Sequence, residues 1–184
     1  MNDIRYTIPG ISLSDGQRLI EILQERLHAM NDLQLTLKHV HWNVVGRNFI
    51  GVHEMIDPQV DVVRGFADDI AERIAALGGS PVGTPGRIAA DRTWNDYSLG
   101  RATTSEHLAA LNVVYDGVIT DNRKAVTLAG EIDPMTEDLL TGQTRDLEQF
   151  QWFVRAHLEE DDGKLVSSGA DSEEAAAKTV ADQG

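Results

Sequence analysis

Five polar residues lie inside otherwise apolar helical patterns, and all of them carry nitrogen or oxygen atoms that bind metals. They are His41, His53, Asp57, Asp68 and Glu72. Mixed imidazole and carboxylate ligands suit iron, zinc or manganese better than calcium or magnesium. The chain has no cysteine, which excludes thiolate zinc sites and iron–sulfur clusters. Carboxylates and histidines with coordination positions left open suit redox chemistry on iron.

Four of these residues belong to one predicted helix, from about residue 52 to Leu77. Its apolar residues recur in steps of three and four, as in an amphipathic α-helix: Val52, Ile56, Val60, Val63, Ala67, Ile70, Ile74 and Leu77. At ~100° per residue, the four polar residues fall at roughly 0°, 40°, 60° and 100° around the axis. His53 and Asp57 are neighbours on this stripe, and so are Asp68 and Glu72. The two pairs lie roughly 16 Å apart along the axis, so one chain carries two half-sites.

A second copy of the helix would bring complementary half-sites together. If two chains pack these helices antiparallel about a two-fold axis, the first pair of one chain faces the second pair of the other. The axis then crosses near residues 62–65, where Gly65 lets two helices approach closely. His41 fits this scheme, because the preceding helix ends at Val45-Gly46-Arg47-Asn48 and the chain then folds back. His41 before the turn can therefore meet His53 after it.

These residues lie in a longer signature. Residues 38–49 read Lys-His-Val-His-Trp-Asn-Val-Val-Gly-Arg-Asn-Phe, and residues 52–57 read Val-His-Glu-Met-Ile-Asp. The motif continues through Asp68-Asp69-Ile70-Ala71-Glu72-Arg73 and Gly78-Gly79. Over roughly residues 14–160 the chain resembles the Dps family of ferritin-like mini-ferritins, the DNA-protecting proteins of starved bacterial cells. In these motifs it resembles the actinobacterial members in particular.

The resemblance implies an all-α fold, a ferritin-like four-helix bundle, assembled as a hollow homododecamer of tetrahedral symmetry. It also implies an inter-subunit di-iron ferroxidase centre. The positions that match this centre are His41, His53 and Asp57 of one chain with Asp68 and Glu72 of its mate, and Glu72 is the expected bridging carboxylate. The expected reaction is oxidation of Fe(II), with hydrogen peroxide preferred over dioxygen, followed by storage of ferric mineral inside the cage.

Apolar periodicity predicts four long helices, at about residues 14–44, 52–77, 101–129 and 133–160. A short extra helix is expected at about 89–97, in the loop between the second and the third. Asp133 is the expected N-cap of the last helix, with Pro134 at its first position. One domain therefore spans 14–162, after an N-terminal tail at 1–13. Residues 163–184 are rich in Ser, Ala, Gly and acids, and we expect them to be disordered.

No run of about 18 apolar residues predicts a membrane span. Residues 1–11 lack a basic start followed by an apolar core, so no signal peptide is evident. We therefore expect a cytoplasmic protein, and the sequence leaves association with the nucleoid open.

The chain is acidic, with 16 Lys and Arg against 30 Asp and Glu and a formal net charge of −14. Affinity for nucleic acid rests chiefly on cations that neutralise phosphates. Many Dps proteins bind DNA through a Lys-rich tail, whereas residues 164–184 hold two lysines against four acidic residues. Direct DNA binding is therefore predicted to be weak or absent.

The same acidity attracts Fe(II). Carboxylates near the start of the last helix line the three-fold pores of ferritin-like cages, and Asp133, Glu137 and Asp138 are the candidates here. The alternative is that these acids simply complement the dipole at the helix N-terminus.

Two tryptophans, Trp42 and Trp152, are predicted to be partly buried aromatic residues. The resemblance adds a role to this prediction: aromatic side chains near such centres can supply electrons and limit the escape of hydroxyl radical. The sequence offers no role for Trp94.

The other histidines have weaker claims as ligands. Glu25-Arg26-Leu27-His28 has the Glu-x-x-His spacing of di-iron bundles, but no second such motif is present, so His28 is expected on the helix surface. His39 is expected to lie behind the site or at the surface. His107 and His157 are expected to be structural.

Three other classes of function remain open. They are a DNA-compacting stress protein, a structural dimer bridged by metal such as zinc without turnover, and a hydrolase on a Dps-like cage. The acidic tails oppose the first, failure to turn over iron would identify the second, and the third lacks a readable Ser-His-Asp arrangement or nucleophile elbow.

Overall fold

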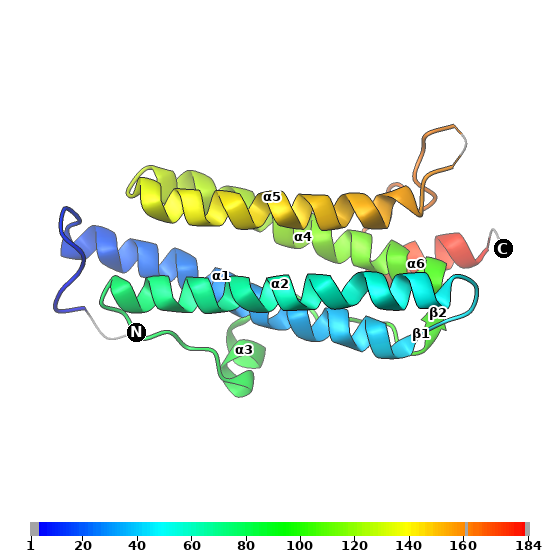
Figure 1. Ribbon diagram of the computed structural model, residues 1–184, viewed down its shortest axis with the longest axis horizontal. Coiled ribbons are helices and arrows are strands. Elements are labelled where there is room, and N and C mark those ends of the chain that lie inside the picture. Colours follow the sequence, from blue (N-terminus) through cyan, green and yellow to red (C-terminus); the bar gives the residue numbers. More distant parts are fainter. Residues whose placement is uncertain (1–3, 161, 183–184) are drawn as a thin grey trace. The chain divides into compact units, whose positions relative to one another are not determined.

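The computed structural model describes residues 4–160 and 162–182, which form six helices and two short strands. The elements are α1 (Leu13–Asn43), β1 (Val44–Val45), α2 (Phe49–Ala76), α3 (Pro85–Asp91), β2 (Ala102–Thr103), α4 (Thr104–Gly130), α5 (Pro134–Ala156) and α6 (Glu173–Ala181) (Figure 1). The all-α prediction, with an extra helix between the second and third long helices, is confirmed. Within these ranges, none of the helices has the length and hydropathy that crossing a membrane requires.

The chain divides into two compact units. Unit 1 consists of Met1–Gln34, Asp61–Asn95 and Asp121–Thr144, and unit 2 consists of Leu35–Val60, Asp96–Thr120 and Arg145–Gly184. Each unit therefore holds one segment of each long helix, α1, α2, α4 and α5.

Unit 1 has a core made from the apolar stripes of its helical segments. Its main buried residues are Leu19, Ile20, Leu23, Leu27, Met30, Leu33, Val63, Phe66, Ile70, Ile74, Leu77, Ala125, Ala129 and Leu140. Hydrogen bonds join the segments: Arg26 donates to Asn122 Oδ1 at 3.4 Å, and Gln143 Nε2 donates to the carbonyl of Phe66 at 3.3 Å. The buried stripe of α2 follows the predicted periodicity, which leaves Asp68 and Glu72 outside the core.

Unit 2 is built in the same way. Its main buried residues are Leu37, Val40, Val44, Val52, Ile56, Val60, Leu108, Leu111, Tyr115, Leu147, Val154 and Leu158. Tyr115 Oη donates to Gln59 Oε1 at 2.6 Å, and Gln151 Nε2 donates to Asn112 Oδ1 at 3.1 Å. Burial raises the pKa of the Tyr115 phenol, so this group stays protonated and remains a donor.

Several helix boundaries differ from the sequence prediction. The short helix α3 begins at Pro85, earlier than expected, because a proline at the first helical position starts a helix well. Helix α2 begins at Phe49 rather than near residue 52, and α5 ends at Ala156. The paired strands β1 and β2 were not predicted, since two residues are too few to show a pattern.

The prediction of a disordered C-terminal tail was wrong for the segment that forms α6. Ala176, Ala177 and Val180 bury one face of this helix. Ser172 caps it by accepting from the backbone N–H of Ala175 at 3.2 Å. Glu173 accepts from the backbone N–H of Ser98 at 2.7 Å, which ties α6 to the loop before β2. Residues 183–184 of the predicted tail, and residues 1–3 of the N-terminal one, lie outside the described residues.

Candidate metal centre

The turn between α1 and α2 sets the positions of two histidines. Strand β1 pairs in parallel with β2, and Thr104 Oγ1 donates to the carbonyl of Arg47 at 2.9 Å. Gly46 and Asn48 have positive φ angles of 95° and 59°, a backbone region that glycine and asparagine adopt at low cost. The chain therefore reverses direction within a few residues.

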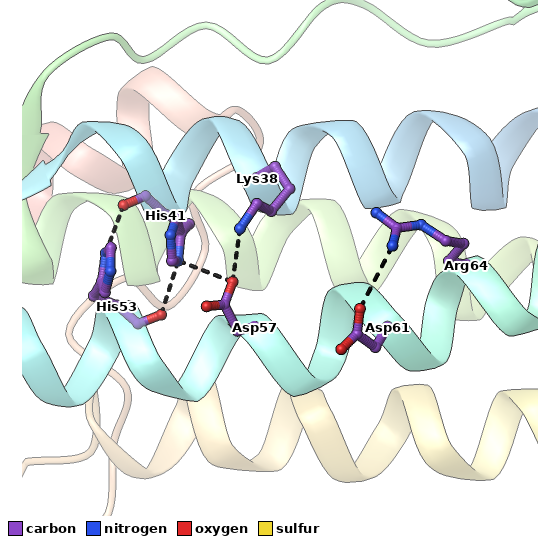
Figure 2. A network of polar contacts seen from close by, with 6 residues as sticks. All are labelled: Lys38, His41, His53, Asp57, Asp61 and Arg64. Atoms are coloured by element: carbon purple, nitrogen blue, oxygen red, sulfur yellow. Dashed lines mark hydrogen bonds and ion pairs between the residues drawn. The ribbon is translucent and has the colours of Figure 1, made fainter.

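His41 and His53 meet across this turn, as the sequence predicted. His41 Nδ1 donates to the carbonyl of His53 at 3.0 Å, and His53 Nδ1 donates to the carbonyl of His41 at 2.9 Å (Figure 2). Their rings stack with centroids 3.6 Å apart. His41 lies in the last turn of α1, where carbonyls lack partners within the helix. Because both Nδ1 atoms donate, the only nitrogen of each ring that can bind a metal is Nε2, as in many metal-binding histidines.

Asp57 joins these histidines from the next turn of α2. Its Oδ1 lies 3.1 Å from His41 Nδ1 and accepts a hydrogen bond from Lys38 Nζ at 2.8 Å. The hydrogen bond from Lys38 is the main reason why the pKa of the Asp57 carboxyl lies below its usual value, and the nearby His41 and His53 add to the effect. Asp57 therefore remains ionised at neutral pH. We call His41, His53 and Asp57 the histidine half-site.

Asp68 and Glu72 lie in unit 1, on the later part of α2, and both are exposed. We call them the carboxylate half-site. Across the residues that the structure describes, no group of three or more His, Asp or Glu side chains is arranged to hold a metal ion. The histidine half-site by itself is therefore not a complete ligand set.

The surface of α2 between the two half-sites is open. A Cβ added at Gly65 would meet no neighbouring atom within 4 Å, and Val62 is 37% exposed. Among the described residues, Gly65 therefore leaves room for a close approach at the point where the sequence places the two-fold axis.

The family model of the ferritin-like domain matches residues 20–163. A DNA protection during starvation protein of Mycolicibacterium smegmatis is 58% identical over 172 residues, which is 94% of each chain. The chain belongs to the Dps family of ferritin-like proteins. The solved structure of DpsA14 from Streptomyces coelicolor has a TM-score of 0.87 and 66% identity, and the match covers 89% of this chain and 99% of that one. A Haemophilus ducreyi relative named fine tangled pili major subunit is 48% identical, over 87% of this chain and 85% of its own.

The three pore candidates of this Dps-family chain differ in their surroundings. Asp133 is only 5% exposed, and its Oδ2 accepts from the backbone N–H and the hydroxyl of Thr136 at 3.0 and 2.6 Å. Arg73 also pairs with this carboxylate. Asp133 is therefore the predicted N-cap of α5, and its oxygens are already engaged. Glu137 is half-buried and Asp138 is exposed, so the pore role stays a prediction that fits Asp138 best.

We expect Asp133→Asn to destabilise the protein by about 2 kcal/mol at neutral pH, because it leaves the charge of Arg73 without its partner. Burial raises the pKa of Asp133, but the bonds from Thr136, Arg73 and Met135 outweigh it and the pKa lies below its usual value. The stabilisation is therefore present above the unfolded pKa of about 3.9 and is lost as pH falls through the lower, folded value. Thermal midpoints of the two proteins should differ at pH 7 and converge below about pH 4. A constant difference across this range would contradict the assignment.

Two of the aromatic predictions need correction. Trp42 is 70% exposed and Trp152 is 62% exposed in the single chain, so neither is partly buried. The apolar ring of a tryptophan suggests burial, but residue type cannot distinguish a core position from a surface that another molecule could cover. Trp94, for which the sequence offered no role, donates from Nε1 to Asp32 Oδ2 at 2.7 Å.

The remaining histidines each form a hydrogen bond within the chain. His28 was expected at the surface but is 4% exposed, and its Nε2 bonds to the carbonyl of Val82 at 3.0 Å, which anchors the loop before α3. His39 bonds to the carbonyl of Leu99 at 2.7 Å. His107 is fully buried, and its Nδ1 is hydrogen-bonded to Tyr97 Oη at 2.9 Å. His157 bonds to the carbonyl of Phe153 in its own helix at 2.7 Å.

Lys38 is the residue of this site to which the sequence analysis gave no role. It lies one turn before His41 on α1, and a spacing of three places both side chains on one helix face. That spacing was the available signal, but a lysine on a helix usually faces solvent, and only the fold brings it to Asp57.

Proposed function

We propose that this protein oxidises Fe(II) and stores the ferric product, and so protects the cell from oxidative damage. The centre would consist of the histidine half-site of one chain and the carboxylate half-site of its mate, with Glu72 bridging two irons. The assembly would be a homododecameric cage in the cytoplasm, with mineral in its cavity. Iron is the substrate of this reaction, and hydrogen peroxide is the preferred oxidant.

The observation that carries this proposal is the reciprocal pair of Nδ1 bonds between His41 and His53. Backbone carbonyls hold both rings in one orientation and leave both Nε2 atoms for a metal. Asp57 supplies an ionised carboxylate beside them. Imidazole and carboxylate ligands together suit Fe(II), as they also suit zinc and manganese.

The exposure of Asp68 and Glu72 supports a centre shared between chains. Two carboxylates one turn apart on a helix can reach the same ion. In a two-fold dimer, each half-site finds its complement on the mate, so every dimer has two equivalent centres.

The chemistry balances if each of two Fe(II) ions gives one electron to the same peroxide. The O–O bond then breaks with two electrons and two protons and yields two molecules of water, so no hydroxyl radical forms. A single iron would transfer only one electron and release the radical. Holding two irons at one centre is therefore what would make the reaction protective.

Protection of DNA, which the names of several relatives mention, would follow from this chemistry rather than from binding. The formal net charge of −14 opposes contact with phosphates. The alternatives are a DNA-compacting protein and a metal-bridged assembly without turnover, and the same experiment separates both from a ferroxidase.

The test adds Fe(II) anaerobically to metal-free protein and then adds peroxide. Ferric absorbance gives the iron oxidised, and a spin trap detects hydroxyl radical. We expect about two Fe(II) oxidised per peroxide with little radical, and no shift of duplex DNA at near-physiological salt. Oxidation no faster than in buffer would leave only a structural metal site or a scaffold.

A further inference from the structure

Two neighbouring residues of the loop before β2 connect helix α4 with helix α6. Tyr97 Oη is hydrogen-bonded to Nδ1 of His107 on α4 at 2.9 Å, and the two rings stack with centroids 6.0 Å apart. The next residue, Ser98, donates from its backbone N–H and its hydroxyl to Glu173 Oε2 on α6, at 2.7 and 3.0 Å. All four residues belong to unit 2, and we call them the α6 latch.

Helix α6 depends on such contacts because it is short. It has nine residues, and an isolated helix of this length is marginal in water. Its buried face consists of Ala176, Ala177 and Val180, and an alanine side chain removes little apolar surface from water. The two hydrogen bonds from Ser98 to the charged carboxylate of Glu173 are therefore an important part of its attachment.

His107 is the member of the latch that can change its charge near neutral pH. Its side chain is fully buried, and within the described part of the chain no residue makes a hydrogen bond to its Nε2. Burial is the main cause that lowers the pKa of His107, and His39 on α1 adds to it. The backbone groups of Asn43 and Gly100 and the carboxylate of Glu106 act in the opposite direction, but the pKa still lies below its usual value.

The carboxylates near the latch are already engaged. Glu106 Oε2 accepts from the backbone N–H and the hydroxyl of Thr103, at 2.8 and 2.6 Å. Glu173 accepts both bonds from Ser98, and its charge adds to burial in raising the pKa of the Tyr97 phenol, which stays neutral. A proton added to His107 would therefore place a poorly compensated charge in the protein interior, which is unfavourable until water reaches the ring.

We propose that the α6 latch is an acid-sensitive switch, in which protonation of His107 favours an open state with Tyr97 and Ser98 moved away from α4 and α6 released. In the open state the hydrated ring has a pKa of about 6.5, above that of the closed state. The closed state therefore has its full stability above this pH, and it loses stability as pH falls below it. The switch requires neither iron nor the proposed metal centre.

Hydrogen exchange of the α6 amides, followed by mass spectrometry on the assembled, metal-free protein, tests this switch. Rates at about pH 7.5 and about pH 5.5 are divided by those of an unstructured peptide at the same pH, which leaves the protection due to structure. His107→Gln cannot be protonated, and Glu173→Gln weakens the acceptor for Ser98. His157→Gln is the matched control, because His157 is an exposed histidine of the same unit.

In the unaltered protein, protection of α6 should fall about 10-fold between the two pH values, because each pH unit below the pKa of the open ring favours opening about tenfold. His157→Gln should show the same fall, whereas His107→Gln should keep its protection. Constant protection in the unaltered protein, or a fall that persists in His107→Gln, would overturn the role of His107.

Glu173→Gln keeps the test decisive if His107→Gln does not fold, because it leaves the buried ring unchanged. It should lower the protection of α6 several-fold already at about pH 7.5, since a neutral amide is a weaker acceptor than a carboxylate. Protection equal to that of the unaltered protein would show that the latch does not hold α6.

Discussion

Two variants that each lack one half-site are expected to be inactive alone and to regain activity when they assemble together. The first is His53→Gln with Asp57→Asn, and the second is Asp68→Asn with Glu72→Gln. Each should oxidise Fe(II) with peroxide about 100-fold more slowly than the unaltered protein, or worse, because every centre has lost two ligands. The substitutions keep side-chain size, so the fold and the assembly should persist.

The mixed assembly gives a result that a centre within one chain cannot give. In random mixing at equal amounts, a centre is intact when an unaltered histidine half-site meets an unaltered carboxylate half-site, which happens in about one quarter of cases. Subunits are separated, mixed and reassembled, and initial rates of ferric absorbance are compared. Unaltered protein taken through the same cycle is the control for losses. A mixture no more active than its parts would show that the two half-sites do not cooperate across chains.

The long helices and the meeting of His41 with His53 could be predicted from the sequence, for simple reasons. The apolar stripe of α2 repeats over many turns, and such long periodic segments are the least ambiguous patterns. The turn at Gly46 and Asn48 separates this stripe sharply from the stripe of α1, so a reversal of the chain follows. A tight reversal brings the residues on its two sides together, so His41 and His53 come into contact.

Other features depend on partners that a local pattern does not reveal. Helix α6 has a composition typical of disorder, yet three apolar residues on one face are buried when the helix packs within unit 2. His28 was expected at the helix surface, but it is buried and bonds to the carbonyl of Val82, which lies in a loop far along the chain. The bond between Lys38 and Asp57 likewise joins two helices. In each case the deciding group is distant in sequence.

Gly65→Trp is expected to abolish assembly through α2 and, with it, oxidation of iron. The α-helix itself tolerates the change, because glycine is the weaker helix former and a Cβ added at Gly65 meets no neighbouring atom within 4 Å. Each two-fold contact would contain two copies of the tryptophan, and overpacking costs about 2 kcal/mol for each. The association constant should fall on the order of 1000-fold. Sedimentation would measure assembly, and circular dichroism would confirm the fold.

Gly117→Trp provides the matched control, since Gly117 is also an exposed glycine within a long helix and has no atom within 4 Å of an added Cβ. It should assemble and oxidise iron like the unaltered protein. If Gly65→Trp assembled normally and kept its activity, α2 could not be the two-fold contact and the half-sites would need another route to each other. A folded but inactive Gly65→Trp monomer would support both the two-fold contact through α2 and the shared metal centre. Such a chain would keep all five ligands and would lack only its mate.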